Sequence, residues 1–401
     1  MKKRGILALA IIMAGLLTGL SGQTVYAAET EETTGVSETA SENLLQGIVK
    51  DESGFSYYYI DGTMQTGWQT IDGNTYYFRK KASETEPKGA MMTGLRKIGG
   101  SKYYFKASGK MLTGWKTIDG SRYYFKSNGK MVTGWKTIDE NRYYFKASGK
   151  MVTGWKTIDN NRFYFSSKGK MATGWKTING KTYYFKKKTG KTLPKGAMLT
   201  GLRKINGYKY YFSAKGVMQT NRIVGSKTEG YYYVDDNGKV ITSKEIKLAV
   251  KFVVAHTDND WSASKKLKTC FNYLWKNYSY KRSYDSANAS TLSGFAVNMF
   301  TTKKGNCFRY AASFACIAKV LGYESRVAVG KISSLHGGMT AHGWTEVKVN
   351  GKWYICDANM QKNYPSINSY MRTESTYAYR HSCSARYVLK TSKGKAVWKK
   401  K

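Results

Sequence analysis

The sequence has 401 residues, with 66 Lys or Arg against 26 Asp or Glu, and a formal net charge of +40. Such a charge repels the chain from itself and favours an anionic partner. The length leaves room for two or more domains. The five cysteines form no pair with the spacing of a metal site, so we expect no metal ion and no cofactor.

The first residues predict a secretory signal peptide over 1–28. Basic residues at positions 2–4 precede an apolar stretch from Ile6 to Leu20, and small residues follow at Ala27 and Ala28. An uncleaved membrane anchor is the alternative. Residues 29–45 are rich in Glu, Ser and Thr and predict a disordered spacer. Export argues against a nucleic-acid partner, and we expect no membrane contact after signal cleavage.

Residues 46–243 form a repeat array. The segment TGWKTIDGSRYYFKSNGKMV recurs with small changes, and its tryptophan returns every twenty positions at Trp115, Trp135, Trp155 and Trp175. Each unit contains two β-branched and aromatic runs separated by turn residues such as Asp119-Gly120, Asn160-Asn161 or Asn179-Gly180. This pattern predicts one β-hairpin per unit. Because one hairpin cannot bury its own apolar face, the hairpins are expected to stack into an elongated solenoid.

Two units are longer than the others and nearly duplicate each other. They begin TGWQTIDGNTYYF and TGWKTINGKTYYF, and each is followed by TGLRKI. Leu95 and Leu202 take the tryptophan position in the units that follow, so the surface there is expected to differ. Less regular hairpins at both ends of the array have the character of end caps.

The array resembles the cell-wall-binding repeat superfamily, which includes choline-binding, glucan-binding and clostridial-toxin repeats. Arg122, Arg142 and Arg162 stand where choline-binding units often carry a tryptophan, so part of the choline cage is missing. The resemblance therefore favours an anionic cell-wall glycan or teichoic acid over choline. The residues expected to bind it are Trp68, Trp115, Trp135, Trp155, Trp175, Tyr124, Tyr144 and Tyr164. The alternative is that these rings only pack the array.

A second, globular domain is expected over 244–401. An amphipathic helix with Leu267, Phe271, Leu274 and Trp275 on its apolar side is capped by Ser262 or Ser264. A second, Ala-rich helix begins at Cys307. A helix N-terminus stabilises negative charge, so it favours the thiolate form of this cysteine.

The base expected for this thiolate is His342. It begins an alternating strand that turns at Asn350-Gly351 into a second strand, which ends at Asp357. The hairpin places His342 close to Asp357, and a carboxylate in that position orients an imidazole whose other nitrogen faces a thiol. His336 is the second choice as the base.

These motifs together resemble the transglutaminase-like superfamily, which has a papain-like α+β fold. The matching segments are Gly305-Asn306-Cys307, His342-Gly343-Trp344, the strand that ends at Asp357, and NYLWKNYSY upstream. The resemblance implies thiol chemistry on an amide bond, with Cys307 as nucleophile, His342 as base and Asp357 as the orienting residue. Cys316 is expected to pack in the core, and at most two disulfides are expected among Cys270, Cys316, Cys356 and Cys383.

The sequence thus predicts a multidomain chain, a β-hairpin repeat solenoid followed by a transglutaminase-like domain. Its expected function is that of an exported enzyme at the cell surface of a Gram-positive bacterium, which hydrolyses a protein or peptide substrate or transfers its acyl group. Two alternatives remain. The chain is a non-catalytic adhesin or glycan-binding protein, or it acts on a host protein with its repeats as receptor binder.

Overall fold

The computed structural model describes residues 44–333 and 337–401. The expected signal peptide, nearly all of the expected spacer, and His336 lie outside the described residues. Within the described part, no helix is long and apolar enough to cross a membrane. The chain divides into two compact units at the boundary between Met92 and Thr93, and each is described by itself.

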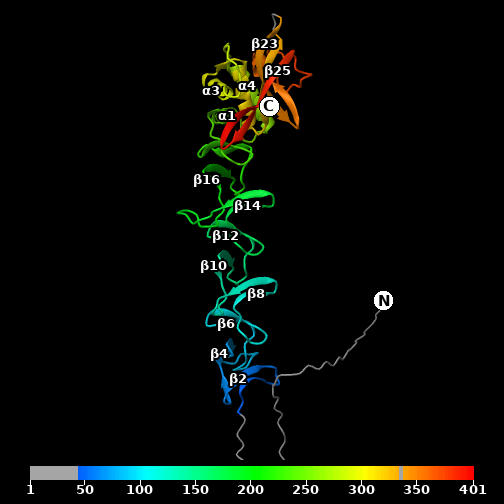
Figure 1. Ribbon diagram of the computed structural model, residues 1–401. Helices are drawn as coiled ribbons and strands as arrows, with labels where there is room; N and C mark the ends of the chain where they lie inside the picture. Colours follow the sequence, from blue (N-terminus) through cyan, green and yellow to red (C-terminus); the bar gives the residue numbers. More distant parts are fainter. Residues whose placement is uncertain (1–43, 334–336) are drawn as a thin grey trace, which may run out of the picture. The chain divides into compact units, whose positions relative to one another are not determined.

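The unit before Thr93 contains a three-stranded sheet and one hairpin (Figure 1). Its strands are β1 (Gly47–Lys50), β2 (Ser56–Ile60), β3 (Thr63–Gln65), β4 (Gly67–Ile71) and β5 (Asn74–Phe78). The second unit opens with a run of seven hairpins. Their strands are β6 (Gly94–Ile98), β7 (Ser101–Phe105), β8 (Gly114–Ile118), β9 (Ser121–Phe125), β10 (Gly134–Ile138), β11 (Asn141–Phe145), β12 (Gly154–Ile158), β13 (Asn161–Phe165), β14 (Gly174–Ile178), β15 (Lys181–Phe185), β16 (Gly201–Ile205), β17 (Tyr208–Phe212), β18 (Arg222–Ser226) and β19 (Gly230–Val234).

The β-hairpins predicted from the repeat are present, and most have two-residue turns. In these turns both central residues have positive φ, as at Asp119 (φ 48°) and Gly120 (φ 68°), which is the geometry that matches strand twist. One predicted turn was displaced by a residue. Asn161 pairs with Ile158, so the turn is Asp159-Asn160 rather than Asn160-Asn161. The preceding Asp is the turn former in every regular unit, and Asn161 instead begins the second strand.

Successive hairpins are joined by backbone hydrogen bonds and by aromatic packing. The segment after each hairpin returns to the preceding hairpin, so that Met151 N–H donates to the carbonyl of Arg122 at 2.8 Å. Trp115 packs against Tyr143 and Phe145 of the next hairpin, with ring centroids 5.1 and 5.9 Å apart. Each unit therefore completes the core of its neighbour, as expected for a repeat array.

The remaining residues fold into helices and one sheet. The helices are α1 (Lys244–His256), α2 (Ala263–Asn277), α3 (Leu292–Thr302), α4 (Cys307–Val320) and α5 (Ala358–Asn363). The short strands β20 (Ser279–Tyr280) and β21 (Lys304–Gly305) pair in parallel. The main sheet consists of β22 (Glu324–Ser333), β23 (Met339–Val349), β24 (Lys352–Cys356), β25 (His381–Ser392) and β26 (Lys395–Lys400) in the order β24-β23-β22-β25-β26, and all its pairs are antiparallel.

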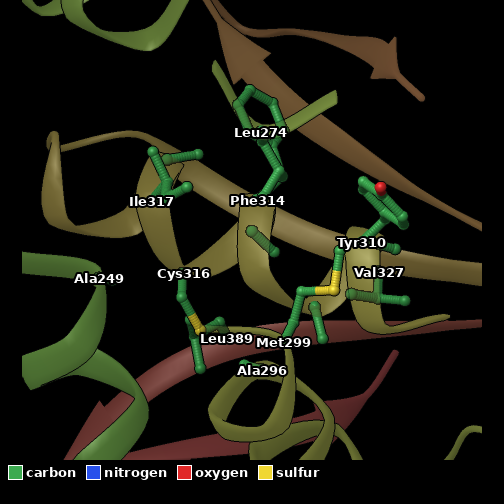
Figure 2. Close-up of a cluster of buried hydrophobic side chains, with 14 of the residues drawn as sticks. Ala249, Leu274, Ala296, Met299, Tyr310, Phe314, Cys316, Ile317, Val327 and Leu389 are labelled. Atoms are coloured by element: carbon green, nitrogen blue, oxygen red, sulfur yellow. The ribbon is translucent and has the colours of Figure 1, made fainter. Parts of the chain in front are cut away.

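Helix α4 is the centre of this α+β fold. Every residue from Cys307 to Val320 except Arg309 is buried, and the helix lies between the sheet and the other helices (Figure 1). Cys316 points into the apolar cluster with Ala296 and Leu389 (Figure 2), where sequence analysis expected it to pack. Burial of this helix along its whole length fixes the position of its first residue, Cys307.

The last hairpin of the array packs into the same core. Tyr233 of β19 is 1% exposed and belongs to the apolar cluster around α1 and α4. Its hydroxyl donates to Asn221, whose side-chain amide donates in turn to the carbonyl of Gly322 at 3.1 Å. The hairpin β18–β19 thus contributes to two cores, that of the repeats and that of the α+β region.

Candidate active site

The candidate nucleophile is the first residue of α4. Asn306 precedes the helix, and its side-chain oxygen accepts the N–H of Arg309 at 3.2 Å, which satisfies one of the free donors at the helix start. Its side-chain amide donates to the carbonyl of Ser283. The asparagine therefore fixes both the helix start and the loop after β20, and Cys307 follows as a buried residue with 7% exposure.

Two glycines allow the close approach of chain segments at this point. A Cβ at Gly343 would lie 2.5 Å from the Phe308 ring, and a Cβ at Gly305 would lie 2.7 Å from two side-chain carbons of Arg309. Both distances are shorter than carbon atoms tolerate. The glycines in the Gly-x-Cys and His-Gly-Trp motifs are therefore required for packing β21 and β23 against the first turn of α4.

His342 and Asp357 meet across the predicted hairpin. Strands β23 and β24 pair with Thr345 opposite Cys356, and they are joined by Asn350 and Gly351, both with positive φ. Nε2 of His342 lies 2.6 Å from Oδ2 of Asp357, and both side chains are buried. A hydrogen bond also joins His342 to Cys307. Since Nε2 faces Asp357, Nδ1 is the ring nitrogen that remains available to the thiol.

Asp357 is itself held by several donors. It is the N-cap of α5, with Oδ1 accepting the N–H of Met360 at 2.9 Å, and its own N–H donates to the carbonyl of Ser369. Burial alone would raise the pKa of Asp357, but the charge and hydrogen bond of His342 and the other donors lower it. The carboxylate is therefore ionised and fixed in orientation.

The charge state of His342 follows from the same contacts. Burial alone would lower its pKa, but the Asp357 charge and the hydrogen bonds to Asp357 and Cys307 raise it to about 10. The imidazole is thus held in its protonated form at neutral pH. An imidazolium between a carboxylate and a thiol is the partner that stabilises a thiolate.

Tyr377 is a contact that sequence analysis missed. Its buried hydroxyl donates to Oδ2 of Asp357 at 2.7 Å, and burial followed by the Asp357 charge raises its pKa, so it stays a donor. Tyr377 lies between α5 and β25, beyond the segment in which motifs were recognised. An aromatic residue in an irregular loop gives no periodic signal, so nothing in the sequence indicated it.

A second tyrosine lies near the candidate nucleophile and is partly exposed. Tyr280 is 44% exposed, and its pKa is raised by partial burial and then by the charge of Cys307. The loop after it is anchored to α4, because Arg309 contacts Asp285 at 2.5 Å and Ser283 at 2.7 Å. The loop is therefore fixed against the first turn of α4, which begins at Cys307.

The other cysteines have different surroundings. All five cysteines are free thiols, so no disulfide forms among the four for which pairing was considered. Burial raises the pKa of Cys270 and Cys356 to about 12 and raises that of Cys316 well above its usual value. Burial also raises the pKa of Cys383. Only Cys307 combines a helix start with an imidazole. Within residues 44–333 and 337–401 no cluster of His, Cys, Asp and Glu side chains could hold a metal ion.

The repeat tryptophans lie in grooves between hairpins. Trp115, Trp135 and Trp155 each contact a tyrosine of their own hairpin edge-to-face, at centroid distances of 5.0 to 5.2 Å; these partners are Tyr124, Tyr144 and Tyr164. The guanidinium groups of Arg122, Arg142 and Arg162 lie over the three indoles, 4.1, 4.2 and 4.5 Å from the ring centroids. The chain's own cation therefore occupies the face that would attract a ligand cation.

Two other tryptophans have different neighbours. In their hairpins a threonine takes the position of the stacking arginine. These threonines are Thr75, which pairs with Thr70 across the hairpin, and Thr182, which pairs with Thr177. In these hairpins Trp68 is 41% exposed and Trp175 is 39% exposed. Trp175 lines a hollow of about 390 Å³ together with Tyr210 and Met218. The five predicted tryptophans thus fall into two groups.

Models of known protein families match segments in both the repeat array and the α+β region. The transglutaminase-like superfamily model matches residues 248–358, which include the three residues of the candidate site. The choline-binding repeat model matches residues 112–153, 152–193 and 199–244, and a cell wall binding repeat model matches residues 66–81 and 93–111. The chain thus matches repeat models over its first part and a transglutaminase-like core model over its second. The predicted fold class is therefore confirmed.

Solved structures similar to the chain include choline-binding proteins of Streptococcus pneumoniae. Choline binding protein F is 35% identical over 47% of this chain and 61% of its own, with a TM-score of 0.42. The same protein with a peptidoglycan analogue is 34% identical over 47% and 61%, with a TM-score of 0.41. CbpJ is 28% identical over 49% and 71%, with a TM-score of 0.43. The chain spans less than two thirds of choline binding protein F. No curated protein matches the chain.

Proposed function

We propose that this protein is an exported enzyme of the bacterial cell surface, in which the transglutaminase-like core breaks amide bonds and the repeats attach it to the wall. The observation that carries the catalytic part is the chain of contacts from Cys307 through His342 to Asp357. The carboxylate fixes the imidazole at 2.6 Å, and the imidazole hydrogen-bonds to a thiol at the start of a helix.

In the proposed reaction the Cys307 thiolate attacks an amide carbonyl and forms a carbon–sulfur bond. The backbone N–H groups of Cys307 and Phe308 have no acceptor within their own helix, and they stabilise the negative oxygen of the intermediate. His342 then donates its proton to the leaving amine as the carbon–nitrogen bond breaks. Water or a second amine releases the acyl group from sulfur, giving hydrolysis or acyl transfer.

Asp357 keeps the imidazole in the orientation that these proton transfers need, and Tyr377 helps to hold Asp357. Burial of all three residues of the site excludes bulk water, which strengthens their mutual electrostatic interactions. The role of each residue is tested by replacing it and following both turnover and alkylation of Cys307.

The repeats support attachment to an anionic wall glycan rather than to choline. Choline-binding proteins have similar repeats, but three of the tryptophan faces in this chain are covered by arginine guanidinium groups. A quaternary ammonium gains nothing at a ring face already occupied by a cation. The same arginines and the exposed lysines attract a phosphate- or carboxylate-bearing polymer such as teichoic acid.

The function is tested by labelling whole cells. The purified chain and the Cys307→Ala variant are added to Gram-positive cells, and released peptides or new cross-links are identified by mass spectrometry. The proposal predicts products that depend on Cys307, and it predicts that both forms bind to the wall. Wall binding without any Cys307-dependent product would instead identify the protein as an adhesin.

A further inference from the structure

The two long repeat units carry loops of the same backbone structure. In the first loop the N–H of Arg79 donates to the carbonyl of Ala90 at 3.0 Å. In the second loop the N–H of Lys186 donates to the carbonyl of Ala197 at 2.9 Å. The bond from Ser83 N–H to the carbonyl of Glu86 recurs as one from Gly190 N–H to Leu193. The loops are therefore two copies of one structure, and their side chains can be compared position by position.

The copies differ in charge. Aligning the units on TGW and TGLRKI places Glu84 opposite Lys191 and Glu86 opposite Leu193. In the first loop Glu86 forms an ion pair with Arg79 at 2.6 Å. The second loop has Lys186 at the position of Arg79 and carries no acidic residue from Lys186 to Leu199. The second copy has therefore lost the carboxylates that neutralise the first.

A hollow of about 660 Å³ lies beside the second loop. Five cationic side chains line it, namely Lys186, Lys187, Lys188, Arg203 and Lys204. No acidic residue lines it, and no ion pair joins any of the five to a residue within 44–333 or 337–401. Glu229 of a following hairpin accepts from Tyr211 instead. The hollow thus gathers positive charge without an internal counter-ion.

The rest of the lining suits a sugar. Tyr184, Leu193, Leu199 and Ile205 form an apolar surface, and Thr189, Thr192 and Asn206 supply hydroxyl and amide groups. An apolar face binds the C–H side of a sugar or polyol, and hydroxyl and amide groups bind its hydroxyls. The lysines and the arginine bind phosphate oxygens by charge-assisted hydrogen bonds.

We propose that this hollow is a binding site for a phosphate-bearing saccharide or polyol segment of a polymer. The proposal rests on the proposed wall attachment and assigns it to one loop rather than to the general positive charge of the array. The first loop serves as the internal reference: it has the same backbone, but its Glu86 carboxylate pairs with Arg79, whereas the second loop has Leu193 in place of that carboxylate.

The experiment transfers the charges of the first loop into the second. The full chain carrying Lys191→Glu and Leu193→Glu is compared with wild type by calorimetry, with a soluble glycerol phosphate oligomer, inorganic phosphate and unphosphorylated dextran as probes. The control variant Lys146→Glu with Lys150→Ala changes the net charge equally at exposed positions of a regular unit. Unchanged Cys307 alkylation in each variant confirms that the chain is folded.

We expect the double-Glu variant to bind the oligomer roughly tenfold more weakly, because one or two charge-assisted contacts are lost. The control variant should change the affinity for the oligomer less than about twofold. Dextran and inorganic phosphate should bind much more weakly than the oligomer. An equal loss of oligomer affinity in both variants would overturn the proposal and show that diffuse charge binds the oligomer. Wild-type binding of dextran or of inorganic phosphate as tightly as the oligomer would overturn it as well. Wall binding measured in parallel separates the two ideas. Oligomer binding without wall binding contradicts the wall attachment alone.

Discussion

Tyr377 donates a 2.7 Å hydrogen bond to Oδ2 of Asp357, the same oxygen that lies 2.6 Å from Nε2 of His342. The carboxylate is therefore held by two hydrogen-bond partners, and its fixed position sets the orientation of the imidazole. This makes Tyr377 a positioning residue of the proposed site, because its hydroxyl acts on the reaction only through Asp357.

Replacing Tyr377 with Phe should reduce the alkylation rate of Cys307 about tenfold at neutral pH, since one hydrogen bond to a charged group contributes about 1.5 kcal/mol. The ring would still fill its apolar pocket, so the melting temperature should fall by only several degrees, the loss of about one hydrogen bond. Rates of iodoacetamide labelling against pH provide the measurement. A labelling profile identical to that of wild type would mean that the hydroxyl has no role in positioning.

The His342–Asp357 pair should make stability depend on pH in a defined direction. The pKa of His342 is raised from 6.5 to about 10, so its contribution is complete below pH 6.5 and is lost as pH rises through about 10. The pKa of Asp357 is lowered from 3.8, so its contribution is present above pH 3.8 and is lost as pH falls below that value. Both contributions are complete between pH 3.8 and pH 6.5. The difference in melting temperature between wild type and His342→Gln should therefore be largest in that range. A difference that does not depend on pH would contradict the ion pair.

Removing one regular repeat, residues 133–152, should leave the rest of the chain folded. In the native chain the N–H of Met151 donates to the carbonyl of Arg122, and the N–H of Met171 donates to that of Arg142. The deletion removes Met151 and Arg142, so Met171 can bond to Arg122 in the same register. Circular dichroism and the alkylation rate of Cys307 should match those of wild type. Deletion of ten residues, half the repeat, breaks this register and serves as the control that should misfold.

The α+β region should not be stable without the last hairpin. Tyr233 is 1% exposed in its core, and deleting a large buried aromatic side chain costs about 3 kcal/mol or more. A fragment starting at Lys244 should therefore unfold at a lower temperature than one starting at Gln219, which retains Asn221 and Tyr233. Equal melting temperatures for the two fragments would show that the hairpin is dispensable, and would support the domain limit of 243 expected from the sequence.

Choline should compete poorly for wall binding by the full chain, and binding should weaken with salt, because screening shortens the range of the basic residues. The variant Arg142→Thr, which copies the threonine found at position 182, uncovers the Trp135 face and should increase competition by choline. Control substitution of Lys150, which contacts no indole, should not. Strong choline competition in wild type would contradict the anion-based account.

The elements that sequence analysis predicted well are those with a local signal. The turn pairs fixed the hairpins, the helix start placed Cys307, and the Asn350-Gly351 turn fixed the register that brings His342 to Asp357. Residues whose role depends on long-range packing were missed. Tyr377 reaches Asp357 from a loop, and Arg122 covers Trp115 from the facing strand of the same hairpin. Tyr377 leaves no periodic or compositional trace, whereas the arginines recur every twenty positions and only their stacking on the indoles was not predicted.

The sequence left the disulfides undecided, and it placed the start of the α+β region at residue 244 without indicating a role for the last hairpin. Cys270, Cys316 and Cys356 are buried in the same apolar cluster and remain free thiols. The repeat pattern continues through β19, so it marks the last hairpin as one more unit and gives no sign that Tyr233 packs into the core of the α+β region.

Selective alkylation of Cys307 tests the central claim most directly. The folded chain is treated with iodoacetamide at neutral pH, and the modification of each of the five cysteines is followed by peptide mass spectrometry in wild type, His342→Ala and Asp357→Asn. The account predicts rapid labelling of Cys307 alone in wild type, since burial raises the pKa of the other four thiols. It also predicts a loss of at least about tenfold in both variants, because the thiolate loses its oriented imidazolium. Labelling of Cys307 at the same rate in all three proteins would contradict the proposed catalytic site.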